Sequence, residues 1–182
     1  MKRSSRSFQI ALSALACAVA AGALTLGSYV HFLFAAGYLI AIFAIMVPLA
    51  KDFYWGASLC FAGAALLAFL FCGFAIFELL PFIAFFGLHP IVNRLQLRFV
   101  KRKPFHALWF IAKAAWFDGA LLLMWFTLGG ILGFTSQTWY PYIASNLYLV
   151  VFLGGTVAFL VYDILIFLCQ RSVDAIIRRI GR

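Results

Sequence analysis

The chain has 182 residues, of which 66% are hydrophobic and only 10% are charged, and its formal net charge is +9. An ordinary soluble domain has roughly a quarter of its residues charged, so this chain lacks the polar surface that a water-facing globule needs. Composition excludes a soluble globular domain and indicates an integral membrane protein, long enough for a single helical bundle.

The cations need an explanation first, because a strong positive charge is also typical of proteins that bind nucleic acid. Here they cluster at the ends of apolar runs rather than along one polar face. Charges at such positions orient membrane helices and attract the anionic lipid of the inner leaflet. We therefore expect the lipid bilayer, and no nucleic acid, as a partner.

The first half of the chain divides into four apolar segments. Residues 7–50 contain no Lys, Arg, Asp or Glu, and because one spanning helix needs ~20 residues, this stretch predicts two spans. Cations precede it, as in a secretory signal, but the apolar run is longer than a signal core and leads into another span. We therefore expect an uncleaved first helix. Residues 53–93 contain a single charge, Glu78, and again predict two spans.

Five cations lie between Arg94 and Lys103 and separate these segments from two further apolar runs. A polar-aromatic loop, residues 134–146, lies between those runs, and a basic tail, residues 170–182, follows the last one. The apolar residues of the tail have the spacing of an amphipathic helix on a membrane surface. The six predicted spans cover residues 8–27, 30–49, 53–73, 79–93, 106–128 and 147–169.

The distribution of cations predicts how the six helices cross the membrane. With both termini in the cytoplasm, the inner segments contain 13 of the 14 Lys and Arg residues, and the three outer hairpins contain none. This asymmetry follows the positive-inside rule. We expect an all-α protein of six transmembrane helices, with cytoplasmic N and C termini, in a bacterial cell membrane.

Three charged residues lie inside the predicted spans, where an ionised side chain costs at least ~2.5 kcal/mol. Lys113 and Asp163 lie at similar depths on sequential, antiparallel helices, so an ion pair between them is expected. Asp118 lies nearer the midplane and points ~140° away from Lys113 on an ideal helix, so it needs a polar partner of its own or a proton. Two interpretations stay open: the three residues hold helices together, or they contact a ligand or a coupling ion.

His89 and Asn93, near the inner end of the fourth span, fall at the same level as Lys113 and Asp163 and complete a predicted intramembrane polar cluster. Each also fits the description of an ordinary satisfied residue at a helix end. No spacing of His, Cys, Asp or Glu matches a metal site, and no nucleotide-binding or nucleophile motif is present. We expect no metal, no cofactor and no enzymatic activity.

Polar and aromatic side chains gather at the outer membrane face. An interfacial aromatic belt explains such a group. The alternative is a lid, in which the aromatic loop lies over the mouth of the bundle and stacks on a flat ligand, with Trp125 and Asp118 below it. The candidate ligand residues are Tyr29, His31, Glu78, Asp118, Trp125, Trp139, Tyr140, Tyr142 and Asn146.

The first helix carries small residues at four-residue spacing, Ala14, Ala18 and Gly22. Stripes of this kind let two helices approach closely in lipid. The partner helix belongs either to this chain or to a second protein, so these three residues are candidate docking positions.

The length, the six helices, the cytoplasmic termini and the Ala14–Ala18 spacing resemble the substrate-binding S component of energy-coupling-factor (ECF) vitamin transporters. The resemblance implies a bundle that binds a vitamin or related micronutrient near the outer surface. It also implies partners: a transmembrane T component, docked on the small-residue face of the first helix, and two cytoplasmic ATPases. The chain departs from that family in the very short loop between its first two helices.

Three functions are compatible with this pattern. The leading hypothesis is capture of a small aromatic or heterocyclic solute from outside the cell. The rival is a membrane scaffold or assembly protein whose buried charges are structural, and the third is a self-sufficient carrier that uses Asp118 as a proton site. A compact cavity in the outer half reached by Trp139 or Tyr142 favours capture, whereas a bundle filled with Phe side chains to its outer surface favours the scaffold.

Overall fold

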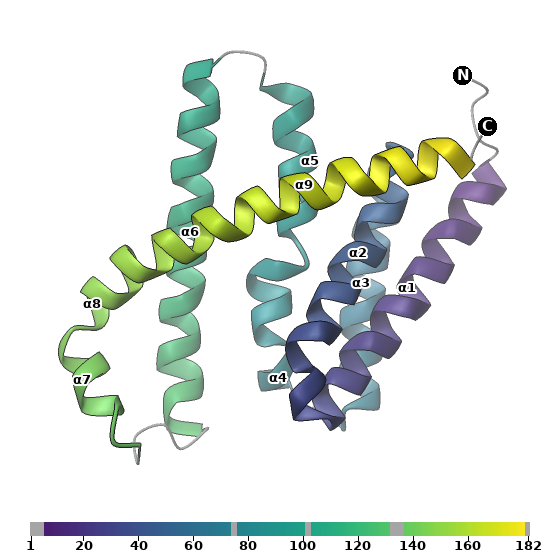
Figure 1. The fold of residues 1–182 in the computed structure, drawn as a ribbon. Coiled ribbons are helices and arrows are strands. Elements are labelled where there is room, and N and C mark those ends of the chain that lie inside the picture. The colour runs from purple at the N-terminus through teal and green to yellow at the C-terminus, as the bar shows by residue number, and fades with distance from the viewer. Residues whose placement is uncertain (1–5, 74–75, 101–102, 132–136, 181–182) are drawn as a thin grey trace. The chain divides into compact units, whose positions relative to one another are not determined.

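The computed structural model describes residues 6–73, 76–100, 103–131 and 137–180. The regular structure of these residues is helical throughout (Figure 1). The chain forms two compact units. The first contains Met1–Arg98 and Ile166–Arg182, and the second contains Phe99–Leu165.

All six predicted segments contain helix at the expected places, but they differ in length. Among the described residues, five helical segments are long and apolar enough to cross a membrane, whereas α2 (Phe34–Ala50) has only 17 residues. These lengths, together with the composition, make the chain a multi-pass helical membrane protein. The five long segments are Arg6–Tyr29, Tyr54–Phe71, Ile76–Phe99, Phe105–Thr127 and Leu147–Ile177.

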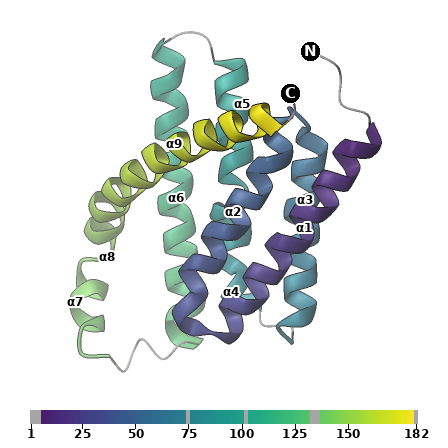
Figure 2. The ribbon, with the colours of Figure 1, turned by 45° about the vertical axis from the view of Figure 1, so that its right-hand side comes forward.

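Three helices form the centre of the first unit: α1 (Arg6–Tyr29), α2 and α3 (Tyr54–Phe71). They lie side by side in both views, and a short 3-10 turn, η1 (His31–Leu33), leads from α1 into α2 (Figures 1 and 2). Small side chains fill the space between them, which lets the backbones come close. The fully buried alanines of these helices are Ala20, Ala41, Ala57, Ala64 and Ala68.

Gly37 shows how closely α1 and α2 approach each other. A Cβ atom at this position would lie 2.5 Å from the carbonyl oxygen of Ala23, so any larger residue would force the two backbones apart. The face of α1 that takes part in this packing carries Ala16, Ala20 and Ala23, all of them buried. In lipid the hydrophobic effect does not drive helices together, so close van der Waals packing of this kind is what holds them.

Two turns in the first unit use left-handed backbone. Gly73 follows α3 with a φ of 62°, which glycine adopts without steric cost, so the helix ends there. Asp52, between α2 and α3, has a φ of 55°, and Asp is among the few other residues that tolerate it. These turns end the second and third helices within two residues of the predicted limits.

The fourth predicted span is not one regular helix. It consists of α4 (Ile76–Pro81), a π-helical turn, η2 (Phe82–Phe86), and α5 (His89–Phe99). Proline lacks a backbone N–H and disturbs the regular helical ladder, and Pro81 directly precedes the π-helical turn. From Ile76 to Phe99, the whole segment extends beyond the predicted limits of 79–93 at both ends.

The second unit contains α6 (Lys103–Ile131), α7 (Tyr140–Ser145), α8 (Leu147–Leu149), a π-helical turn, η4 (Val150–Gly155), and the first part of α9 (Thr156–Ile180). The predicted aromatic loop, 134–146, is not without regular structure: it contains the short helix α7, which Pro141 starts at its N-terminal end. Residues 134–136 of that loop lie outside the described residues. Helix α6 ends at Ile131, beyond the predicted end of the fifth span at residue 128.

Helix α9 is continuous from Thr156 to Ile180, so no break separates the sixth predicted span from the predicted tail at residue 170. The described part of the tail, residues 170–180, is helical, as predicted, and residues 181–182 lie outside the described residues. The last turns of α9 cross the end of α2 in both views (Figures 1 and 2). The ammonium of Lys51, at that end of α2, donates to the carbonyl oxygen of Ile177 at 3.5 Å. The tail therefore contacts the end of α2 inside the first unit.

Candidate functional site

The predicted ion pair between Lys113 and Asp163 is confirmed. The Nζ atom of Lys113 and the Oδ1 atom of Asp163 are 2.6 Å apart, and the two side chains are 2% and 8% exposed. A charge-assisted hydrogen bond of this length offsets much of the free energy that is lost when both charges leave water. The pair joins α6 to α9 inside the second unit.

Aromatic rings surround this ion pair. The ring of Phe159 is fully buried, and its centroid lies 6.0 Å from the Nζ atom of Lys113, close enough for a cation–π attraction. Phe110 and Phe117 of α6 pack against the same ring, with centroid distances of 5.4 and 5.7 Å. Because these rings exclude water, the Coulomb attraction inside the pair is stronger than at a surface.

Asp118 has a different environment. The hydroxyl of Thr156, the first residue of α9, donates to its Oδ2 atom at 3.1 Å. Its Oδ1 atom is buried and has no hydrogen-bond partner among the described residues. A Cβ atom on Gly155 would lie 2.6 Å from that Oδ1 atom, so only glycine lets the π-helical turn η4 come this close to α6.

The other half of the predicted polar cluster belongs to the first unit. Asn93 donates through Nδ2 to the Oε1 atom of Gln170 at 3.1 Å, and Gln170 donates to the carbonyl oxygen of Pro90 at 2.8 Å. His89 is fully buried and packs on the ring of Phe85, with centroids 5.0 Å apart. Asn93 therefore ties α5 to α9 within the first unit, whereas His89 packs against the preceding π-helical turn η2. The four residues of the predicted cluster thus lie in two separate sets, one in each unit.

An ion-pair junction, formed by Arg94, Asp52 and Asp174, holds three elements of the first unit together. Arg94 donates to Asp174 of α9 at 2.6 Å and to Asp52 of the turn before α3 at 3.3 Å. Near it, the guanidinium of Arg98 lies 5.2 Å from the ring centroid of Tyr54. Cations that were read only as topology signals thus also fasten the tail to the bundle.

The candidate ligand residues of the first unit make structural contacts. The hydroxyl of Tyr29 donates to the carbonyl oxygen of Phe71 at 2.8 Å, which ties the end of α1 to the end of α3. The backbone carbonyl of Glu78 accepts a hydrogen bond from the hydroxyl of Tyr38, which is buried. His31 begins η1, and its side chain is not among those described.

The remaining candidates lie in the second unit, on α6 and around α7. The rings of Trp125 and Tyr140 stack nearly parallel, with centroids 5.1 Å apart and an interplanar angle of 5°. Trp139 and Tyr142 are exposed, and Asn146 donates to the carbonyl oxygen of Tyr142 at 3.3 Å. The structure therefore brings one predicted aromatic pair together, and the side chains of Trp139 and Tyr142 are 40% and 77% exposed.

The predicted docking positions Ala14, Ala18 and Gly22 are all exposed on α1. In the described part of the chain, no atom beyond its own helix backbone and chain neighbours would lie within 4 Å of a Cβ on Gly22. The small-residue face that packs against α2 and α3 is a different one. Helix α1 thus has two small-residue faces, of which the described part of the chain covers one.

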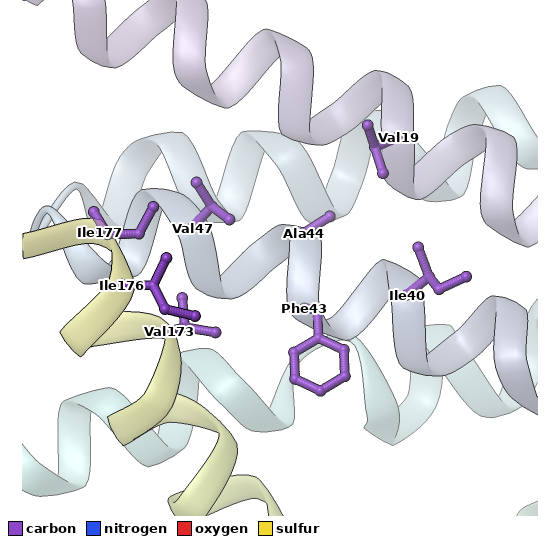
Figure 3. Close-up of a pocket in the computed structure, with 8 residues that line it drawn as sticks. All are labelled: Val19, Ile40, Phe43, Ala44, Val47, Val173, Ile176 and Ile177. Carbon is purple, nitrogen blue, oxygen red and sulfur yellow. The ribbon is translucent and has the colours of Figure 1, made fainter. Parts of the chain in front are cut away.

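Two hollows open on the first unit, and no candidate ligand residue is among the described residues that line them. One has a volume of about 320 Å³ and an apolar wall, and Figure 3 shows Val173, Ile176 and Ile177 of α9 facing Phe43 and Val47 of α2 across it. The other, of about 420 Å³, lies at the ion-pair junction beside Tyr54 and Arg98. Neither is the outer cavity that solute capture predicts.

Four residues that matter for these contacts did not stand out in the sequence. Thr156 and Tyr38 are single polar groups inside apolar runs, and Gln170 lies where such a run ends. Asp174 stands in a segment that reads as a lipid-facing amphipathic tail. Gln170 and Asp174 could have been found from their position: both are polar residues on a helix that continues a predicted span, where a contact with a neighbouring helix is expected.

Comparison of the chain with protein-family models, with curated proteins and with solved structures gives no match. The fold and the site define a class, a multi-pass helical membrane protein with a buried ion pair and a buried acid. Function has to be argued from those contacts alone.

Proposed function

We propose that the chain is a membrane-embedded subunit that acts together with a second membrane protein. The observation that carries this proposal is the exposed stripe of Ala14, Ala18 and Gly22 on α1. An uncovered face of small residues suits close approach by another helix, whereas lipid alone gives no reason for small side chains there. This is the docking mode that the resemblance to S components of ECF transporters implies.

The proposed topology has six spans with both termini in the cytoplasm of a bacterial cell. Helix α2, at 17 residues, is at the lower limit for crossing a bilayer. With α2 included, 13 of the 14 cations fall on one side, which the positive-inside rule favours. Without α2, the cationic segments would be divided between the two sides.

In the leading form of the proposal, the subunit captures a small flat solute from the outer side, and a T-type subunit with ATPases completes transport. The stacked rings of Trp125 and Tyr140 support it, because a heterocycle binds to aromatic faces of this kind. The exposed rings of Trp139 and Tyr142 offer further stacking surface.

A second form is a scaffold or assembly subunit with purely structural charges. It is favoured by the aromatic packing around Tyr38, whose ring lies against Phe34, Phe82 and Phe86 with centroids between 4.6 and 5.9 Å away. It is also favoured by the short Lys113–Asp163 contact, which leaves no reason to invoke a ligand for either charge.

Purification from native membranes with Ala18→Leu tests the shared claim. A larger side chain on the stripe should reduce the amount of co-purified membrane partner about tenfold, which corresponds to ~1.4 kcal/mol of binding free energy. Ala62→Leu, at an exposed alanine of α3, is the matched control and should leave the amount unchanged. The thermal stability of the isolated chain should be the same for both variants, because neither position is packed within it.

Two results would contradict the docking proposal: no partner with the unaltered chain, or equal recovery with Ala18→Leu. Native mass spectrometry then separates the two forms. A retained small molecule that Trp125→Ala removes supports solute capture, and a partner complex without any small molecule supports the scaffold.

A further inference from the structure

We propose that Asp118 is a proton-binding site inside the membrane, occupied at neutral pH. The residue is only 4% exposed and lies near the middle of the apolar segment Phe105–Thr127. The ligand of this site is therefore the proton itself, held as a neutral carboxylic acid. The inference concerns the isolated chain and does not depend on a docking partner.

The hydrogen bonds of Asp118 suit a neutral acid better than a carboxylate. A carboxylate has two acceptor oxygens and is stabilised when donors reach both of them. Here Thr156 reaches Oδ2, and Oδ1 is buried without a donor among the described residues. The hydroxyl of Thr156 serves either form, since it can accept a hydrogen bond from a protonated carboxyl as well as donate one.

Among the described residues, the charged groups of the elements packed around Asp118 leave it without a counter-ion. On α6 the nearest is Lys113, whose ammonium is 2.6 Å from Asp163. The turn η4, which packs on α6, has the sequence VVFLGG and carries no titratable side chain. On the following part of α9 the titratable groups are Tyr162 and Asp163, and Asp163 is held by that ammonium.

The approach of Gly155 explains why Oδ1 is buried. The backbone of η4 lies so near that even a methyl group on Gly155 would overlap this oxygen. This oxygen is buried in an apolar span, and no donor or cation of the described residues reaches it to hold a negative charge. Under these conditions a buried acid neutralises itself by keeping its proton.

Asp163 provides a comparison inside the same unit. It too is buried in a span, but an ammonium lies 2.6 Å from its Oδ1 atom. A carboxylate with such a partner stays ionised. The structure thus assigns opposite protonation states to two aspartates on neighbouring helices.

Infrared spectroscopy of the protein in lipid vesicles tests the assignment, because a protonated carboxyl has its own carbonyl band. The chain contains only five acidic side chains, so the spectrum is simple. We expect the band at neutral pH in the unaltered protein and its loss in Asp118→Asn, whose amide has nearly the shape of the neutral acid. Asp174→Asn, which alters a carboxylate paired with Arg94, should keep the band.

A spectrum without the band, or a band that persists in Asp118→Asn, would overturn the proposal. Should that variant fail to fold, the unaltered protein decides the matter through its reaction with a membrane-soluble carbodiimide, because a protonated carboxyl adds its proton and oxygen across a C=N bond of that reagent. Mapping by mass spectrometry should find Asp118 modified at least about tenfold more than the ion-paired Asp163. Equal modification, or modification of Asp163 alone, would contradict it.

Discussion

Two polar contacts join α6 to α9, and they differ in kind. Lys113 and Asp163 form a contact between two opposite charges, each with a short partner. Asp118 and Thr156 form a contact between an acid and a hydroxyl, in which one acid oxygen has no donor among the described residues. A helix pair in lipid is therefore held by charge at one point and by a single hydrogen bond at the other.

The two contacts also reach across the helix pair by different means. Thr156 and Asp163 are seven residues apart, two turns along one face of α9, whereas Lys113 and Asp118 point ~140° apart on α6. The long stem of Lys113 allows its ammonium to reach Asp163 from that angle. Asp118 has a short side chain, so its contact needs the backbone itself to come close, which Gly155 permits.

The largest effect is expected from Lys113→Ala. This change leaves the carboxylate of Asp163 buried without its partner, and breaking a buried pair in this way typically costs ~3–5 kcal/mol of unfolding free energy. Thermal unfolding in detergent should therefore shift strongly to lower temperature. The double variant Lys113→Met with Asp163→Leu removes both charges and should recover most of the loss, and an unchanged unfolding temperature in Lys113→Ala would show that the pair contributes little.

The ion pair could be predicted from sequence because charges are rare in apolar segments. Two opposite charges at equal depth on sequential helices have few other partners available. The partner of Asp118 could not be predicted in the same way, since the hydroxyl of Thr156 looks like any threonine of a span. The π-helical turn η4, which changes the register just before Thr156, has no clear sequence signal either.

The same difference separates the fold-level predictions that were confirmed from those that failed. The positions of the helices follow from runs of apolar residues, which respond directly to the absence of water. The link between Arg94 and Asp174 joins residues 80 positions apart, and no local pattern indicates it. The packed face of α1 was missed for a related reason: alanines surround that helix, so spacing alone did not show which face meets α2.

A smaller effect is expected from Gly155→Ala, which tests the close approach at Asp118. The new methyl group would lie 2.6 Å from Oδ1 of Asp118 and 3.0 Å from a methyl of Leu121. Overpacking of this kind costs ~1–3 kcal/mol. The matched control is Gly154→Ala, where a Cβ meets nothing within 4 Å. Both variants gain the same helix propensity, so the difference between their unfolding temperatures isolates the contact, and equal temperatures would show that η4 and α6 are not this close.

The smallest effect is expected from Thr156→Val, which keeps the shape of the side chain and removes the hydroxyl. If Asp118 is a neutral acid, the loss is that of one neutral hydrogen bond, ~1 kcal/mol, whereas a hydrogen bond to an ionised group is worth up to ~3 kcal/mol. Thr127→Val is the control, because its hydroxyl donates within its own helix to the carbonyl oxygen of Leu123 at 2.7 Å. A loss of stability in Thr156→Val as large as that in Lys113→Ala would mean that Asp118 is charged, and the two contacts between the helices would then be of the same kind.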